Sequence, residues 1–200
     1  MKRKTQRLRK KLNNAGMTLT EMIVTFALIA LFMVAATRII SYVIGIYYAA
    51  GGNAHGLQVS EMISNKIVGQ IEGASSAMTP AVTSDGSGID QLKFIDATGS
   101  NVTITASPQI LADGSQGGNY LTIHYDAVTE GSIKYEAVDW RFDAKAYMGY
   151  VVKSLRFESP GSGYPDNVMK MVMVLHSERY GDYESTYYLK CINVDKIEFK

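Results

Sequence analysis

The sequence lacks the residue patterns that mark most enzymes and disulfide-stapled proteins. Its 200 residues include a single cysteine, Cys191, and one cysteine cannot form an internal disulfide. Its three histidines are far apart, and no nucleophile elbow, phosphate-binding loop or HExxH motif is present. We therefore expect no enzymatic activity, no cofactor and no metal site. A composition of 46% hydrophobic and 20% charged residues also excludes wholesale disorder and a polytopic membrane protein.

Acidic residues are missing from the first sixteen positions, which carry seven lysines and arginines. Residues 17–200 carry the other 13 cations and all 19 acids, a net charge of 13 − 19 = −6. A basic segment ahead of an apolar run is expected to stay on the cytoplasmic side of a membrane. The alternative is a nucleic-acid-binding arm, but no basic patch or stacking platform follows and the remainder is acidic. We therefore predict no direct nucleic-acid binding.

An apolar segment follows this basic stretch. Residues 22–37 carry no charge, and sixteen helical residues span about 24 Å, slightly less than a hydrocarbon core of about 30 Å. Arg38 interrupts the segment, but residues 39–50 ("IISYVIGIYYAA") continue largely apolar. The Arg38 side chain could extend to a membrane interface or find an acidic partner. The pattern predicts a single membrane-inserting helix over residues 17–50.

Glu21 lies just inside the start of this segment, where a carboxylate needs an explanation. A secretory signal peptide requires a small-residue cleavage site, for which only weak candidates exist ("VAATR", "YYAAGG"). A plain signal anchor leaves Glu21 unexplained, although a charge near a helix end costs less than one at its centre. Cleavage after Gly16 would place a new amine on Met17, one turn from Glu21. The carboxylate would then lie at the positive end of the helix dipole and could pair with an amine on a neighbouring helix.

The stretch "AGMTLTEMIVTFALIALFMVA" (15–35) resembles the type IV prepilin signal, also called the class III signal peptide. In that family a short basic leader ends in glycine. The mature chain then begins with a hydrophobic residue, often Phe, and has Glu at its fifth position. Gly16, Met17 and Glu21 match these positions, with Met17 in place of Phe as a mild departure. The resemblance implies removal of residues 1–16 by prepilin peptidase, methylation of Met17, and a salt bridge from Glu21 to the N-terminal amine of an adjacent subunit.

The resemblance also implies where such a protein works. Pilins and pseudopilins are held in the cytoplasmic membrane by this helix, with the C-terminal domain outside the cytoplasm. An inner-membrane assembly platform then packs the helix into a filament with other pilin or pseudopilin subunits. We expect a minor pilin or pilin-like subunit. The alternatives are a minor pseudopilin of a type II secretion or competence DNA-uptake system, and an uncleaved membrane-anchored binding protein.

Residues 51–75 are expected to continue the helix as an amphipathic segment. Its apolar residues form a stripe at roughly helical spacing that can cover a sheet: Leu57, Met62, Ile63, Ile67, Val68 and Ile71. The adjacent glycines in "AAGGNAHG" (49–56) each weaken a helix by about 1 kcal/mol relative to alanine. They predict either a kink or one long helix with a soft joint. His55 in this segment is expected to be a polar surface residue.

Residues 76–200 show the alternation and turn residues of antiparallel strands. The predicted strands are 92–95, 102–105, 120–125, 133–142, 150–158, 168–177 and 183–193. The last two are expected to form a hairpin across residues 181–182. Met169, Met171 and Met173 share one face of their strand, which suits a central strand with the helix on one side. The expected fold is therefore α+β and pilin-like, with a long N-terminal helix packed on an antiparallel sheet and residues 76–200 as the globular domain.

Three smaller features complete the expectations. The loop "SDGSGID" (84–90) has the look of a calcium loop but lacks the EF-hand pattern, so a solvated turn is predicted. Asp139 and Asp143 are expected on one solvated face beside Trp140 and Phe142. Cys191 is expected to be a small buried apolar residue.

Overall fold

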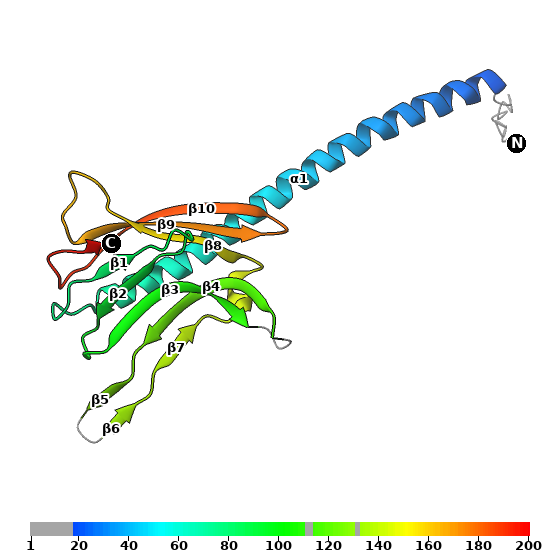
Figure 1. The fold of residues 1–200 in the computed structure, drawn as a ribbon. Helices are drawn as coiled ribbons and strands as arrows, with labels where there is room; N and C mark the ends of the chain where they lie inside the picture. The colour runs from blue at the N-terminus through cyan, green and yellow to red at the C-terminus, as the bar shows by residue number, and fades with distance from the viewer. Residues whose placement is uncertain (1–17, 111–113, 131–132) are drawn as a thin grey trace, which may run out of the picture. The chain divides into compact units, whose positions relative to one another are not determined.

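The computed structural model describes residues 18–110, 114–130 and 133–200, which fall into two compact units with a boundary between Ile46 and Tyr47. One helix, α1 (Leu19–Ile71), begins in the first unit and ends in the second (Figure 1). Of the two expectations for the glycine-rich segment, the single long helix is the one observed.

The second unit contains the strands. The larger sheet has the order β11-β1-β2-β3-β4-β7 and is built from β1 (Ala81–Thr83), β2 (Gln91–Ile95), β3 (Asn101–Ile110), β4 (Gln116–Tyr125), β7 (Val138–Arg141) and β11 (Glu198–Phe199). A second sheet, β10-β9-β8, contains β8 (Val151–Glu158), β9 (Val168–Ser177) and β10 (Gly181–Lys190). A two-stranded hairpin joins β5 (Val128–Glu130) to β6 (Ile133–Tyr135), and a 3-10 helix, η1 (Ala144–Tyr147), precedes β8. Among the described strands only β1 and β11 pair in parallel, so the predicted α+β fold of a long helix on a mainly antiparallel sheet is confirmed.

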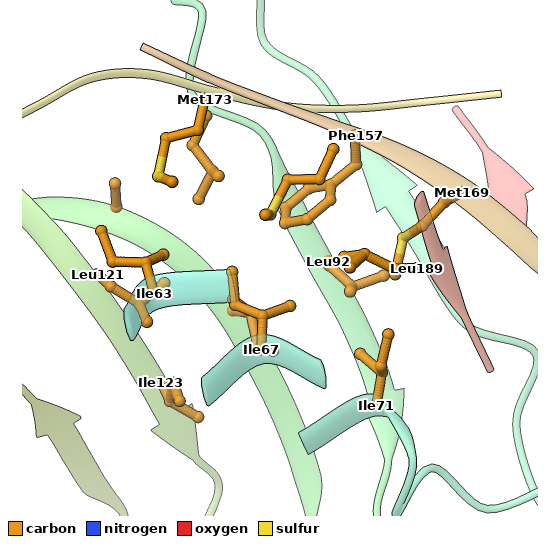
Figure 2. Close-up of a cluster of buried hydrophobic side chains, with 14 of the residues drawn as sticks. Ile63, Ile67, Ile71, Leu92, Leu121, Ile123, Phe157, Met169, Met173 and Leu189 are labelled. Atoms are coloured by element: carbon orange, nitrogen blue, oxygen red, sulfur yellow. The ribbon is translucent and has the colours of Figure 1, made fainter. Parts of the chain in front are cut away.

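The C-terminal part of α1 packs into a core to which both larger sheets contribute. Val59, Ile63, Ile67 and Ile71 recur every four residues and are fully buried, which places them on one face of the helix. Figure 2 shows Ile63, Ile67 and Ile71 pointing toward side chains from both sheets, among them Leu92, Leu121, Ile123, Phe157, Met169, Met173 and Leu189. The predicted stripe was right at Ile63, Ile67 and Ile71, but Leu57 is 45% exposed.

The methionine-rich strand β9 is the middle strand of the three-stranded sheet. Met169, Met171 and Met173 are fully buried on its inner face and belong to the core. The prediction of a central strand with the helix on one side is confirmed. Unbranched methionine side chains fill irregular gaps, which suits a strand that must fit between a helix and two neighbouring strands.

A second stripe on α1 explains the glycines. Gly52, Gly56, Ser60 and Ser64 also recur every four residues and are buried. An added Cβ on Gly52 would lie 2.8 Å from Tyr180 Cβ, and one on Gly56 would lie 2.8 Å from Tyr183 Cβ. Further along, the Ser60 hydroxyl bonds to the Tyr187 hydroxyl at 2.8 Å.

The small residues of α1 therefore let the β9–β10 hairpin approach the helix backbone closely. The Tyr150 hydroxyl adds a buried hydrogen bond of 2.9 Å to the Gly52 carbonyl. The ring of His55 packs edge-on against Tyr180, with ring centroids 5.6 Å apart, so this residue is half-buried rather than a plain surface residue as predicted.

Two strand predictions need correction. The segment 133–142 is not one strand, because β6 pairs with β5 whereas β7 pairs with β4 in a different sheet. The hairpin turn between β9 and β10 is formed by residues 178–180, since Gly181 already pairs with Ser177 and Asp182 with His176. Gly181 has a positive φ of 81°, which fits a three-residue hairpin loop followed by a left-handed residue.

Asp139 and Asp143 are both exposed, as predicted, but they do not lie along one strand. Asp139 lies on β7 and its Oδ1 is 2.6 Å from His124 Nδ1 on β4. Asp143 lies beyond the end of β7 and caps η1, where its Oδ1 accepts a hydrogen bond of 2.8 Å from the backbone N–H of Lys145. The strand alternation that motivated the prediction ends at Arg141.

Candidate processing and assembly site

The start of α1 is built around a reciprocal pair of residues, Thr18 and Glu21. The backbone N–H and the hydroxyl of Thr18 donate to Glu21 Oε2, at 2.8 and 2.9 Å. The backbone N–H of Glu21 is in turn 3.2 Å from the Thr18 hydroxyl oxygen. This is a capping box, in which two backbone N–H groups at a helix start are each satisfied by the other residue's side chain. The sequence signal, Thr-x-x-Glu ahead of an apolar run, was present, but its capping meaning was missed.

The capping box gives Glu21 a structural role within its own chain. Its Oε2 takes both hydrogen bonds, and Oε1 receives none from the described part of the chain. A negative charge in the first turn also interacts favourably with the helix dipole. Of the three predicted site residues only Glu21 can be placed, because Gly16 and Met17, with the rest of the leader 1–16, lie outside the described residues.

Hydroxyl groups along the first unit are satisfied within the helix itself. Thr25 donates to the Glu21 carbonyl at 2.6 Å, Thr37 to the Met33 carbonyl at 2.8 Å, and Ser41 to the Thr37 carbonyl at 3.0 Å. Each bond reaches back one turn, so a hydroxyl in an apolar environment does not remain unpaired.

The first part of α1 exposes apolar side chains around its whole circumference. An 18-residue window of the helix has a mean hydropathy of 2.4 and none of it is buried. The large exposed side chains include Ile23, Phe26, Ile29, Phe32, Met33, Ile40 and Ile44. A helix that is apolar on all sides is stable only inside a membrane or a protein assembly. By length and composition this helix can cross a membrane once.

Arg38 is the one charged residue in the helix between Glu21 and Glu61. It is exposed and forms no ion pair within the residues that the structure describes. Its side chain therefore remains available to a membrane interface or to an acidic partner on another subunit.

The histidines of the second unit have separate partners. His124 on β4 contacts Asp139 and, through Nε2 at 3.1 Å, Asp126. The hydrogen bond to Asp139 is the main cause that raises the pKa of His124 above its ordinary value. His176 on β9 instead pairs with Asp182 on β10, with His176 Nδ1 2.5 Å from Asp182 Oδ1. Within the described ranges no three His, Cys, Asp or Glu side chains are grouped so that they could hold a metal ion.

The loop 84–90 contains one solvated and one buried carboxylate. Asp85 accepts a hydrogen bond of 2.8 Å from the Ser87 N–H, as expected of an exposed turn. Asp90 is buried, and its Oδ2 accepts a hydrogen bond of 2.8 Å from the Phe157 N–H on β8. The prediction of a solvated turn is therefore right for Asp85 and wrong for Asp90, which ties the loop to the three-stranded sheet.

Cys191 follows β10 and is buried, as predicted. Burial raises the pKa of its thiol to about 11, so the thiol is protonated at neutral pH. A protonated buried thiol is a poor nucleophile, which agrees with the expectation of a packing role.

Comparison with protein families finds a match in the N-terminal part of the chain. The prokaryotic N-terminal methylation motif matches residues 11–37, which include Gly16, Met17 and Glu21. No curated protein and no solved structure matched the chain. The motif points to a structural filament subunit rather than to an enzyme family. The resemblance stated from the sequence is thereby confirmed.

Proposed function

We propose that this chain, a type IV prepilin-like protein with a class III signal peptide, works as a minor subunit of a type IV filament. In this proposal prepilin peptidase cuts after Gly16 and methylates the new N-terminus at Met17. Before assembly the apolar part of α1 anchors the subunit in the cytoplasmic membrane, with the β domain outside the cytoplasm. An inner-membrane assembly platform then moves the helix into a filament core with other pilin subunits.

The observation that carries the proposal is the difference in exposure between the two parts of α1. Its N-terminal part offers exposed apolar side chains on every side, whereas its C-terminal part is buried in the core of the second unit through Val59, Ile63, Ile67 and Ile71. The first part can exchange lipid contacts for contacts with other apolar helices without exposing its side chains to water. The second part keeps the β domain attached throughout.

The geometry of Glu21 supports a role in setting subunit register. Because Oε2 is used by the capping box and Oε1 accepts no bond from residues 18–110, 114–130 and 133–200, the carboxylate can keep its own helix start ordered and still accept a bond from another chain. The proposed donor is the methylated N-terminal amine of an adjacent subunit. In an apolar filament core an ion pair is strong only when both charges are present and closely placed.

Three substitutions separate capping from charge pairing. Glu21→Gln keeps a capping-box side chain but removes the charge, since Gln and Glu both serve at this position. Thr18→Ala removes the cap and keeps the charge, and Glu21→Ala removes both. If charge pairing controls assembly, Glu21→Gln and Glu21→Ala lose incorporation into filaments, whereas Thr18→Ala assembles. Normal assembly of Glu21→Gln would limit Glu21 to capping and remove the proposed pairing role. Membrane amounts of each variant, measured by immunoblot, control for expression.

The processing step is tested by mass spectrometry of the protein from cells with and without the peptidase. The expected mature N-terminus is Met17 carrying one methyl group. An intact leader in peptidase-competent cells would contradict cleavage and favour the uncleaved membrane-anchored protein. Deletion of the gene then distinguishes the systems, because loss of pili, of protein secretion or of DNA uptake each identifies a different filament.

A further inference from the structure

The turn of the β9–β10 hairpin carries an arginine, Arg179, whose guanidinium donates no hydrogen bond to the part of the chain that the structure describes. The guanidinium carbon of Arg179 lies 5.1 Å from the ring centroid of Tyr48 and 5.3 Å from that of Tyr180. Two aromatic rings thus hold the guanidinium by cation–π contacts. Arg179 is exposed and forms no ion pair with any residue that the structure describes.

The other two arginines of the second unit behave differently. Arg141 Nη2 lies 3.9 Å from Asp139 Oδ2, and Arg156 Nη1 lies 3.2 Å from Glu158 Oε1. Arg179 therefore differs from both, because aromatic rings position it and no carboxylate among the described residues is bound to it. A planar guanidinium with free donors matches the geometry of phosphate oxygens.

The surface around Arg179 has the composition of a membrane interface. Tyr47 is 76% exposed and Tyr48 42% exposed, and Met148, also exposed, lines the same hollow as Arg179. Tyrosine is enriched at both interfaces of a bilayer, where its ring is buried and its hydroxyl is hydrated. We call Tyr47, Tyr48, Met148 and Arg179 the basal collar.

The length of α1 between Thr18 and Tyr48 matches the thickness of a bilayer. Tyr48 follows Thr18 by 30 residues, which corresponds to about 45 Å of helix. A bilayer including both headgroup layers is about 40–45 Å thick. With the polar capping box at the cytoplasmic interface, Tyr47 and Tyr48 therefore reach the opposite headgroup layer.

A hollow beside Arg179 leaves room for headgroup atoms. It has a volume of about 520 Å³ and is lined by the hairpin turn with Met148 and Gly149. The remaining surface does not compete for anionic lipid, because residues 47–200 carry 12 cations and 18 acids, a net charge of 12 − 18 = −6. A net negative charge repels an anionic leaflet, so the collar is favoured over other faces. Glu178, exposed next to Arg179, is the acid that opposes this contact.

From these observations we propose that the basal collar binds the phospholipid headgroups of the outer leaflet, with Arg179 donating to a lipid phosphate. The β domain of the unassembled subunit is then held against the bilayer in one orientation, and leaves it when the helix is extracted. The proposal rests on the membrane insertion of α1 in the proposed function, and not on cleavage or on the type of filament.

A label at the hairpin turn tests the contact in the full-length protein. Glu178→Cys places a fluorophore beside Arg179, and Thr98→Cys in the exposed β2–β3 turn is the matched control. The native Cys191 is buried and its pKa is about 11, so it does not compete for the label. Quenching by acrylamide is compared between nanodiscs containing phosphatidylglycerol and maltoside micelles, which contain no phosphate. We expect protection at position 178 in nanodiscs only, and no protection at position 98.

Variants of Arg179 in the Glu178→Cys background test the phosphate contact. Arg179→Gln is expected to lower the ratio of docked to undocked domain about fivefold, the effect of one basic residue near an anionic surface, and Arg179→Lys to restore part of it. Equal quenching in nanodiscs and micelles, or full protection in Arg179→Gln, would overturn the proposal. So would saturable binding of inorganic phosphate in micelles, which would make Arg179 a site for the free anion. Failure of the protein to enter nanodiscs at all would instead contradict the membrane anchor.

Discussion

Gly56 tests whether the hairpin β9–β10 needs a glycine on α1 in order to pack. An ideal Cβ at Gly56 would lie 2.8 Å from both Cβ and Cδ2 of Tyr183. Tyr183 Cβ is fixed to the backbone of β10, so Gly56→Ala forces the strand itself to shift. Gly69 is the matched control, because it lies on the same helix and an added Cβ there meets no atom within 4 Å.

Two opposing contributions determine the change in stability. Replacing a helical glycine with alanine stabilises the helix by about 1 kcal/mol. Overpacking a close contact costs about 1–3 kcal/mol, and Gly56→Ala meets this cost whereas Gly69→Ala does not. We therefore expect Gly69→Ala to raise the free energy of unfolding by about 1 kcal/mol. The free energy of unfolding of Gly56→Ala is expected to be about 1–3 kcal/mol lower than that of Gly69→Ala. Relative to the unmodified protein, Gly56→Ala then loses up to about 2 kcal/mol of stability.

Thermal unfolding of the full-length protein in detergent micelles measures this difference. The chain has a single tryptophan, Trp140 on β7, whose fluorescence reports on the second unit. Each kcal/mol corresponds to roughly 2–4 °C in Tm for a domain of this size. If Gly56→Ala raised Tm as much as Gly69→Ala does, the close approach of helix and hairpin would be refuted.

Two further predictions concern charged groups of the second unit. The contact with Asp139 raises the pKa of His124 above 6.5, so the pair stabilises the fold fully below pH 6.5 and loses its effect as pH rises through the folded pKa. The difference in Tm between the unmodified protein and His124→Gln should therefore be larger at pH 6 than at pH 8. A difference in Tm that does not depend on pH would contradict this. Asp90→Ala leaves the buried Phe157 N–H without its acceptor and should lower the free energy of unfolding by about 1–3 kcal/mol in urea titrations. Asp90→Asn keeps an acceptor oxygen and should lower the free energy of unfolding by less. Equal decreases for the two variants would argue against the hydrogen bond.

The N-terminal helix could largely be predicted because its signals are local. Charge, glycine and glutamate spacing indicated the prepilin-like motif and the apolar run from the sequence. The Thr18–Glu21 capping box was equally readable, since it depends on residues three apart. Local spacing alone does not separate this role from pairing with an amine at Met17, because both place the Glu21 carboxylate at the start of the helix.

The contacts of the second unit could be predicted only in part. Strand alternation correctly indicated the buried methionines of β9, because pleating fixes which side chains share a face. The role of Gly52 and Gly56 could not be predicted from the sequence. A glycine in a helix predicts lower helix stability, and only the structure shows that Tyr180 and Tyr183 pack against these two positions. Likewise the split of residues 133–142 between two sheets depends on which strand each half pairs with.

The capping box changes what Glu21 can contribute to assembly. An unpaired carboxylate in an apolar core would gain by meeting any donor, and glutamate and glutamine would then differ little as acceptors. In this structure Glu21 already has two donors, the N–H and the hydroxyl of Thr18. Because both bonds go to Oε2, a neighbouring subunit adds one donor at Oε1, whereas the attraction between two opposite charges acts on the whole carboxylate and is the larger part of the gain. In the proposed assembly the partner that benefits most is the N-terminal amine of an incoming subunit, which meets a carboxylate already oriented by its own helix. Register selection through Glu21 should for that reason depend on its charge more than on its hydrogen-bonding capacity, and this difference is what the comparison of Glu21→Gln with Thr18→Ala measures.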